Sequence, residues 1–309
     1  MNIYDIKRKA NELLVNHDKL FEVLLYIGII QAIFSAVSTL FDGVVGGIVS
    51  LIITILTLTL SHGAIVASLK TVNNMEESID EKEDALVGLK KIGHLFPTYF
   101  LYDFIIGIIC FVVGIIGFLI IMSVSSVSIE QFLQLFTITI NGITVSQAQI
   151  VNTADAFSNV FSILTLVICL IIFIAVYFSL RFGLFNYILQ KYDMTGMAAL
   201  KESSRLMKGN KWTLFKLEFS FFGWMILAGL VSGVVAMFVE TAIIAGVFTM
   251  LVEIIIPISF LASLIESILT VFVSVYLYEM KLNVCVAVFY EELDYEDKYG
   301  NMQAQDEGM

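Results

Sequence analysis

Six stretches of the sequence are long, apolar and almost free of charge, and they constrain the fold more than any other feature. They are residues 20–41, 44–60, 104–122, 160–180, 219–239 and 264–277. About 20 apolar residues in a helix cross the hydrocarbon core of a bilayer. The chain of 309 residues is 59% apolar and only 15% charged, whereas ordinary soluble domains carry about 25% charged residues. The sequence therefore predicts an all-α polytopic membrane protein.

The lysines and arginines fall into four clusters separated by three long gaps, at residues 20–69, 92–180 and 217–280. Basic residues beside membrane spans stay in the cytoplasm. If all four clusters are cytoplasmic, each gap crosses the membrane an even number of times. We therefore predict six transmembrane helices, arranged as three hairpins with both termini inside. A seven-helix arrangement with the C-terminus outside is the alternative.

Two segments between the predicted spans have a composition of their own. Residues 240–262 contain two glutamates and a proline. We interpret this segment as an outer helix extension, an interfacial helix or a re-entrant piece, with a membrane-spanning segment as the alternative. Residues 123–159 are the sizeable outer loop. Within it, residues 136–145 alternate polar and apolar side chains around Asn141 and Gly142, which predicts a small hairpin.

The chain is predicted to be one transmembrane domain, residues 1–293, followed by an acidic disordered tail, residues 294–309. Each predicted hairpin follows an amphipathic cytoplasmic segment, which suggests three repeats. Their bounds are 1–75, 76–195 and 196–293. The formal net charge of −11 comes largely from two acidic segments, residues 76–84 and 291–308. Nucleic-acid binding needs a basic patch instead, so we expect no nucleic-acid partner.

Three ionisable residues within or near the apolar runs are candidate functional groups. Charges at membrane depth are costly and mark functional sites by default. Asp103 and Arg181 are predicted at similar depth on the two helices of one hairpin, where an ion pair would offset the cost of each charge. That pair is either structural or part of a gate. Glu266 is either a membrane-embedded acid or, if the last span starts at Leu264, an interfacial residue.

Catalytic and metal-binding motifs are missing from the sequence. The histidines are scattered at positions 17, 62 and 94, and the three cysteines have no metal-ligand spacing. A hydrolase needs a nucleophile with a base, or a metal set, and neither pattern occurs. We therefore expect a non-enzymatic protein without cofactor or metal.

Four basic residues gather just before the fifth apolar run and are candidate contacts for lipid headgroups. They are Arg205, Lys208, Lys211 and Lys216. Each basic residue near an anionic membrane surface contributes about 1 kcal/mol of binding free energy. Trp212 and Trp224 flank the same point, and indole rings favour the headgroup level.

Residues 199–227, ALKESSRLMKGNKWTLFKLEFSFFGWMIL, together with FYEEL at 289–293, resemble a bacterial integral-membrane family known as domain of unknown function 975. The resembling features are Ser203 or Ser204, the turn at 207–211 and Trp224. The amphipathic start and the six-helix layout fit as well. The resemblance implies a multi-pass protein of the bacterial plasma membrane. It implies no catalytic residues.

Three hypotheses for function follow. The first is a non-enzymatic scaffold, accessory subunit or transport-related component, whose partners are the lipid bilayer and either anionic lipids or another membrane protein. The alternative is a transporter or channel with a polar pathway near Asp103, Arg181 and Glu266. A lipid-processing enzyme ranks third, because no nucleophile–base set is present.

Overall fold

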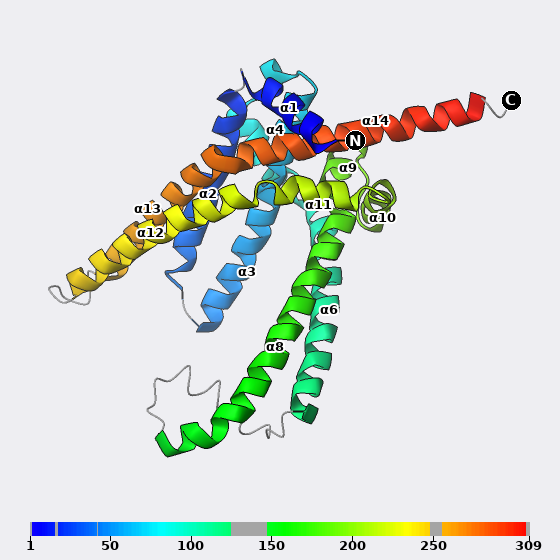
Figure 1. Cartoon of the computed structure of the whole chain (residues 1–309). Coiled ribbons are helices and arrows are strands. Elements are labelled where there is room, and N and C mark those ends of the chain that lie inside the picture. The colour runs from blue at the N-terminus through cyan, green and yellow to red at the C-terminus, as the bar shows by residue number, and fades with distance from the viewer. Residues whose placement is uncertain (1, 16–17, 42, 125–146, 248–254, 307–309) are drawn as a thin grey trace. The chain divides into compact units, whose positions relative to one another are not determined.

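The computed structural model describes residues 2–15, 18–41, 43–124, 147–247 and 255–306, and these residues form helices but no strand (Figure 1). The long apolar helices are α2 (Asp18–Ser38), α3 (Gly43–Leu60), α6 (Ile92–Val124), α8 (Gln147–Phe182), α12 (Phe222–Val247) and α13 (Ile255–Ser274). The other helices are α1 (Ile3–Leu14), α4 (His62–Val72), η1 (Glu76–Ser78), α5 (Glu81–Lys90), α9 (Phe185–Tyr192), α10 (Met197–Leu206), α11 (Lys211–Phe219) and α14 (Met280–Asp306). A π-helical turn, Val275–Glu279, joins α13 to α14.

Five helical stretches among the described residues are long and apolar enough to cross a membrane. They are Asp18–Ser38, Gly43–Val72, Ile92–Ile121, Ser162–Tyr192 and Phe260–Lys298. The pair α11 and α12, bent by 40° at a short break, gives a sixth span if it crosses as one. This is the architecture of a polytopic helical membrane protein, as the composition predicts.

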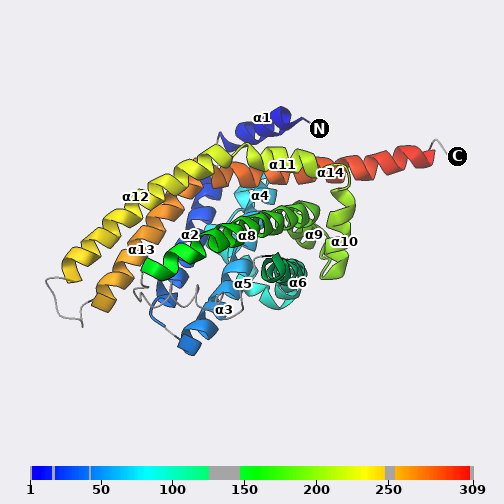
Figure 2. The same cartoon turned by 60° about the horizontal axis from the view of Figure 1, so that its bottom comes forward.

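The chain divides into two compact units. One comprises Met1–Phe100 with Arg181–Met309, and the other is Leu101–Leu180. In the second unit α6 packs against α8 at Gly117, where an added Cβ would lie 2.5 Å from Val167 Cγ1. In the first unit α12 and α13 run side by side, as Figures 1 and 2 both show. There α2 packs on α13 through Gly28, which has no room for a side chain beside Val271.

Most of the largest fully buried side chains of the first unit lie outside its long apolar helices. We call α1, α4, α5, α9, α10, α11 and α14 the helical head. Its side chains below 2% exposure include Ile188, Leu200, Met207, Leu214 and Tyr290. The long helices instead carry exposed aromatics such as Phe173, at 70%. Lipid tails cover such surface without the cost that water imposes.

Close helix contacts in the head depend on two glycines. An added Cβ at Gly88 of α5 would overlap the carbonyl oxygen of Thr59 at the end of α3. One at Gly63 of α4 would lie 2.6 Å from the carbonyl oxygen of Asp84. The buried Asp84 carboxylate accepts two hydrogen bonds of 2.7 Å from Lys70 Nζ, which fixes α4 to α5 at the same crossing. Only glycine permits backbones to approach this closely.

Three sequence-based predictions concern segments outside the helix cores. The predicted disordered tail from residue 294 is helical as far as Asp306, because α14 does not end where the apolar sequence ends. Segment 240–262 begins as the last turns of α12 and finishes as the first turns of α13, so its described parts are helix extensions. The predicted hairpin at 136–145 lies outside the described residues. The three repeats remain a prediction.

Candidate functional site: a polar network along α14

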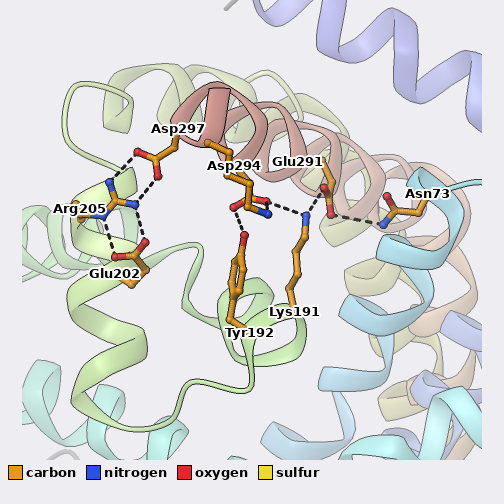
Figure 3. A network of polar contacts seen from close by, with 9 residues as sticks. Asn73, Lys191, Tyr192, Glu202, Arg205, Glu291, Asp294 and Asp297 are labelled. Carbon is orange, nitrogen blue, oxygen red and sulfur yellow. Dashed lines mark hydrogen bonds and ion pairs between the residues drawn. The ribbon is translucent and has the colours of Figure 1, made fainter. Parts of the chain in front are cut away.

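Three acidic residues on α14 are spaced three apart and lie along one side of the helix. They are Glu291, Asp294 and Asp297 (Figure 3). Residues three and four apart are neighbours on a helix surface, which explains the row. Asp294 is only 6% exposed. A buried carboxylate is stable only with hydrogen-bonding partners or a counter-charge, and α9 supplies both.

Lys191 and Tyr192, at the end of α9, reach this acidic row, as Figure 3 shows. Lys191 Nζ lies 2.5 Å from Glu291 Oε2 and 2.9 Å from Asp294 Oδ2. The Tyr192 hydroxyl donates to the other oxygen of Asp294. Lys298, one turn further along α14, donates to Asp294 Oδ2 at 3.1 Å. The Asp294 carboxylate is therefore the centre of the network.

Arg205 on α10 lies between two carboxylates and makes a forked contact with each (Figure 3). Its Nε and Nη2 donate to the two carboxylate oxygens of Glu202, at 2.8 and 2.6 Å. Its Nη1 and Nη2 donate to Asp297, at 2.7 Å each. The hydrogen bonds that Arg205 donates to Glu202 first, and then to Asp297, raise the pKa of Arg205 above its ordinary value. A permanent cation thus joins α10 to α14.

Two weaker contacts extend the network to α4 and α1. Asn73, at the end of α4, donates to Glu291 Oε1 at 3.5 Å. Lys9 of α1 lies 3.5 Å from Glu292 Oε1. The acidic side of α14 therefore meets four other helices of the head, and these helices come from separate parts of the chain.

A second polar cluster lies inside the head around His62, which is fully buried. Its Nδ1 lies 3.0 Å from the Tyr99 hydroxyl, and its Nε2 lies 3.2 Å from Gln190 Oε1. Both ring nitrogens therefore have partners, as a buried polar group requires. Nearby, Tyr187 of α9 stacks on Tyr290 of α14, with ring centroids 5.2 Å apart. These contacts connect α4, α6, α9 and α14.

The segment that resembles the family motif, residues 199–227, contains the turn between α10 and α11. Two of its serines form hydrogen bonds with residues at the break between α8 and α9. Ser203 Oγ accepts a hydrogen bond of 3.2 Å from the Leu184 backbone nitrogen, and Ser204 Oγ accepts one of 2.8 Å from Arg181 Nε. Met207 is fully buried below the turn. Gly209 has φ of +89°, a conformation that side chains other than glycine rarely adopt.

The structure locates each candidate residue predicted from sequence. Asp103 lies on α6 in the Leu101–Leu180 unit, whereas Arg181 belongs to the other unit, so their ion pair stays a prediction. Glu266 lies roughly three turns into α13, which begins at Ile255 rather than at Leu264. Arg205 is held by Glu202 and Asp297.

The lysines beyond Arg205 lie on or beside α11. Lys208 and Lys216 are exposed, and Lys211 is half-buried. Their contact with lipid headgroups stays a prediction. Among the residues that the structure describes, no group of three His, Cys, Asp or Glu side chains is placed to hold a metal ion.

The α14 network was not anticipated from sequence. Its acids belong to a segment whose charge is typical of a solvated surface. The spacing of Glu291, Asp294 and Asp297 is a helical signal, but their partners lie about 100 residues away in the chain. Only the tertiary arrangement brings Lys191 and Arg205 to α14.

Apolar helices of membrane length, joined by a buried helical head with an ion-pair network, define an integral membrane protein of the helical class. The chain belongs to the family described as Protein of unknown function (DUF975), whose model matches residues 1–294. The family resemblance seen in the sequence is thereby confirmed. No curated protein and no solved structure matches the chain.

Proposed function

We propose that this protein is a non-enzymatic component of the bacterial plasma membrane, a scaffold or accessory subunit whose helical head presents a rigid surface on the cytoplasmic side. The observation that carries the proposal is the saturation of the network along α14. Glu291, Asp294 and Asp297 all contact cations or donors of neighbouring helices. Because each of these carboxylates is paired with a residue of another helix, the charges hold α14 against α9 and α10.

The buried polar groups of the head support the same role. His62 is fully buried and contacts Tyr99 and Gln190 through its two ring nitrogens, so it is not open to a substrate from solvent. The Lys70 and Asp84 pair is likewise internal, with Nζ 2.7 Å from both carboxylate oxygens. A catalytic base must reach the proton that it abstracts. Satisfied networks of this kind make a core rigid and specify one packing.

The test is to purify the protein from its native membrane in mild detergent and identify what co-elutes by mass spectrometry. A stoichiometric protein partner supports the scaffold or accessory role. A variant of the head surface, such as Glu12→Lys on the exposed side of α1, then tests which surface the partner uses. A homogeneous protein that carries only a small solute would overturn the proposal. It would favour the transporter hypothesis, for which Asp103 and Arg181 are the first residues to substitute.

A further inference from the structure

Helix α11 has two apolar sides, and only one of them is buried in the protein. Leu214 and Leu217, at 1% and 0% exposure, face the head. On the other side Trp212 is 62% exposed and Phe219 is 59% exposed. Exposed aromatic surface of this extent is uncommon on a protein face that meets only water.

Trp212, Phe219 and Phe222, which are exposed, and Phe215, which is half-buried, form a continuous stack that crosses the break between α11 and α12. Trp212 stacks on Phe215 with centroids 5.0 Å apart, Phe215 on Phe219 at 5.7 Å, and Phe219 on Phe222 at 5.4 Å. The interplanar angles are all below 20°. The stack therefore runs from α11 into the apolar helix α12 that follows it.

Two lysines beside this stack provide positive charge. Lys216 Nζ lies 5.5 Å from the Trp212 ring, and Lys208 is exposed in the turn before α11. Within the described parts of the chain neither lysine makes an ion pair, whereas neighbouring Arg205 is bound by two carboxylates. Lys208 and Lys216 are both exposed, so their charge is open to the surroundings of the protein.

We propose that the exposed side of α11, with its aromatic stack and Lys208 and Lys216, binds anionic lipid headgroups at the membrane surface. A helix that lies at the membrane surface buries Trp and Phe side chains at the boundary of the headgroups and acyl chains, and lysines beside them attract negatively charged headgroups. The buried side of α11 keeps the helix attached to the head, which contacts it through α14 and α1. Lys7 of α1 adds a contact 4.8 Å above the Phe221 ring, at the break itself.

The two tryptophans of the chain allow a direct test. Trp224→Phe leaves Trp212 as the sole indole, and Trp212→Phe leaves Trp224 on α12. Each protein is reconstituted into vesicles that contain either brominated phosphatidylglycerol or brominated phosphatidylcholine at the same mole fraction. Quenching of Trp212 fluorescence then gives the relative affinity of the two lipids for this surface.

We expect brominated phosphatidylglycerol to be preferred at Trp212 by about fivefold for each lysine. Lys208→Gln combined with Lys216→Gln should remove most of that preference. Lys82→Gln with Lys90→Gln, two exposed lysines of α5, is the matched control and should leave it unchanged. Circular dichroism of each variant confirms that the helices are intact.

Two results would overturn the proposal. Equal quenching by both lipids, insensitive to the lysine substitutions, would mean that the aromatic stack contacts lipid without selecting its charge. Absence of quenching at Trp212, with normal quenching at Trp224, would mean that the protein is embedded but that this surface meets something other than lipid. The inference rests on the proposed function only in taking the protein as membrane-embedded, and the Trp224 signal tests that point separately.

Discussion

Arg205 is held by two carboxylates at once because its guanidinium is planar and carries donors along two edges. A lysine has a single ammonium group and contacts carboxylates as a point charge. The geometry at Arg205 therefore depends on the residue type as well as on its charge. Residue type also matters at Ser203 and Ser204, because each hydroxyl oxygen accepts one hydrogen bond near the break after α8. Ser203 accepts from the Leu184 backbone nitrogen, and Ser204 accepts from Arg181 Nε.

Arg205→Lys is expected to destabilise the head by about 1 kcal/mol, since it keeps the charge but loses the forked hydrogen bonds. The measurement is the apparent melting temperature of the purified protein in detergent. Arg8→Lys on α1 is the control, because Arg8 pairs with exposed acids of its own helix, Asp5 and Glu12, at 3.5 and 3.9 Å. Equal melting temperatures for the two variants would contradict the role assigned to Arg205.

Asp80 gives a pH-dependent prediction, because it caps α5 with its carboxylate. Its Oδ1 accepts from the backbone nitrogens of Glu83 and Lys82, at 2.8 and 3.1 Å, and the bond from Glu83 most strongly lowers the pKa of Asp80. The charged form is thus favoured by folding. Its stabilising effect is present above the ordinary pKa of about 3.9 and is lost as the pH falls through the folded value.

Asp80→Asn keeps a side chain that caps well but cannot titrate. The substituted protein is expected to melt slightly below the unsubstituted protein at pH 7, with the difference shrinking below about pH 4. Melting curves at pH 7, 5 and 3.5 provide the check. Parallel curves across that range would show that the Asp80 charge does not contribute.

At the scale of elements, the joints between helices are more specifically encoded than the helices themselves. The long helices need only apolar composition, which is why their approximate positions could be predicted from the charge-free runs. The joints need particular residues, such as Gly209 with its positive φ and Gly88 beside the Thr59 carbonyl. The π-helical turn that continues α13 into α14 carries no proline or glycine, so nothing in it ends the helix, whereas the acidic composition after residue 290 is typical of a solvated segment.

Gly209→Ala is expected to destabilise the protein by roughly 1 kcal/mol, because alanine is strained at a positive φ. Gly223→Ala is the matched control: Gly223 lies in α12 with an ordinary φ and open space around its Cα. That substitution should be neutral or slightly stabilising, since alanine favours helices. The readout is thermal unfolding followed by circular dichroism. Equal effects of the two substitutions would contradict the turn geometry.

At the scale of the whole molecule, sequence patterns predicted the class but not the network. Charge-free runs mark spans because the bilayer selects composition over some 20 residues at a time. The pairing of Asp297 with Arg205 depends on where two distant helices meet, and no local pattern contains that information. Asp294 and Asp297 fall within residues 294–309, whose composition predicts an acidic disordered tail, although Asp294 is buried.

Two truncated chains test the part that α14 plays in the molecule. A chain that ends at Lys298 keeps every acid of the network and is expected to melt like the full chain. A chain that ends at Tyr290 loses Glu291, Asp294 and Asp297, which removes the carboxylate partners of Lys191 and the hydrogen-bond acceptor of Tyr192. That loss should cost roughly 2–3 kcal/mol and lower the apparent melting temperature by several degrees.

A full-length chain with Glu291→Gln, Asp294→Asn and Asp297→Asn separates the loss of charge from the loss of length. It should melt close to the chain that ends at Tyr290. If both truncated chains melt at the same temperature, α14 does not hold the head together.

The order of synthesis gives the α14 network a further consequence. The ribosome makes α14 after α1, α4, α9 and α10, so Lys191 and Arg205 emerge long before the carboxylates that bind them. Until α14 arrives, the surfaces that it will cover stay open, and the earlier helices cannot lock into their final arrangement. A chain interrupted before residue 291 would carry this unfinished surface, which is the kind of feature that quality-control proteases and chaperones recognise.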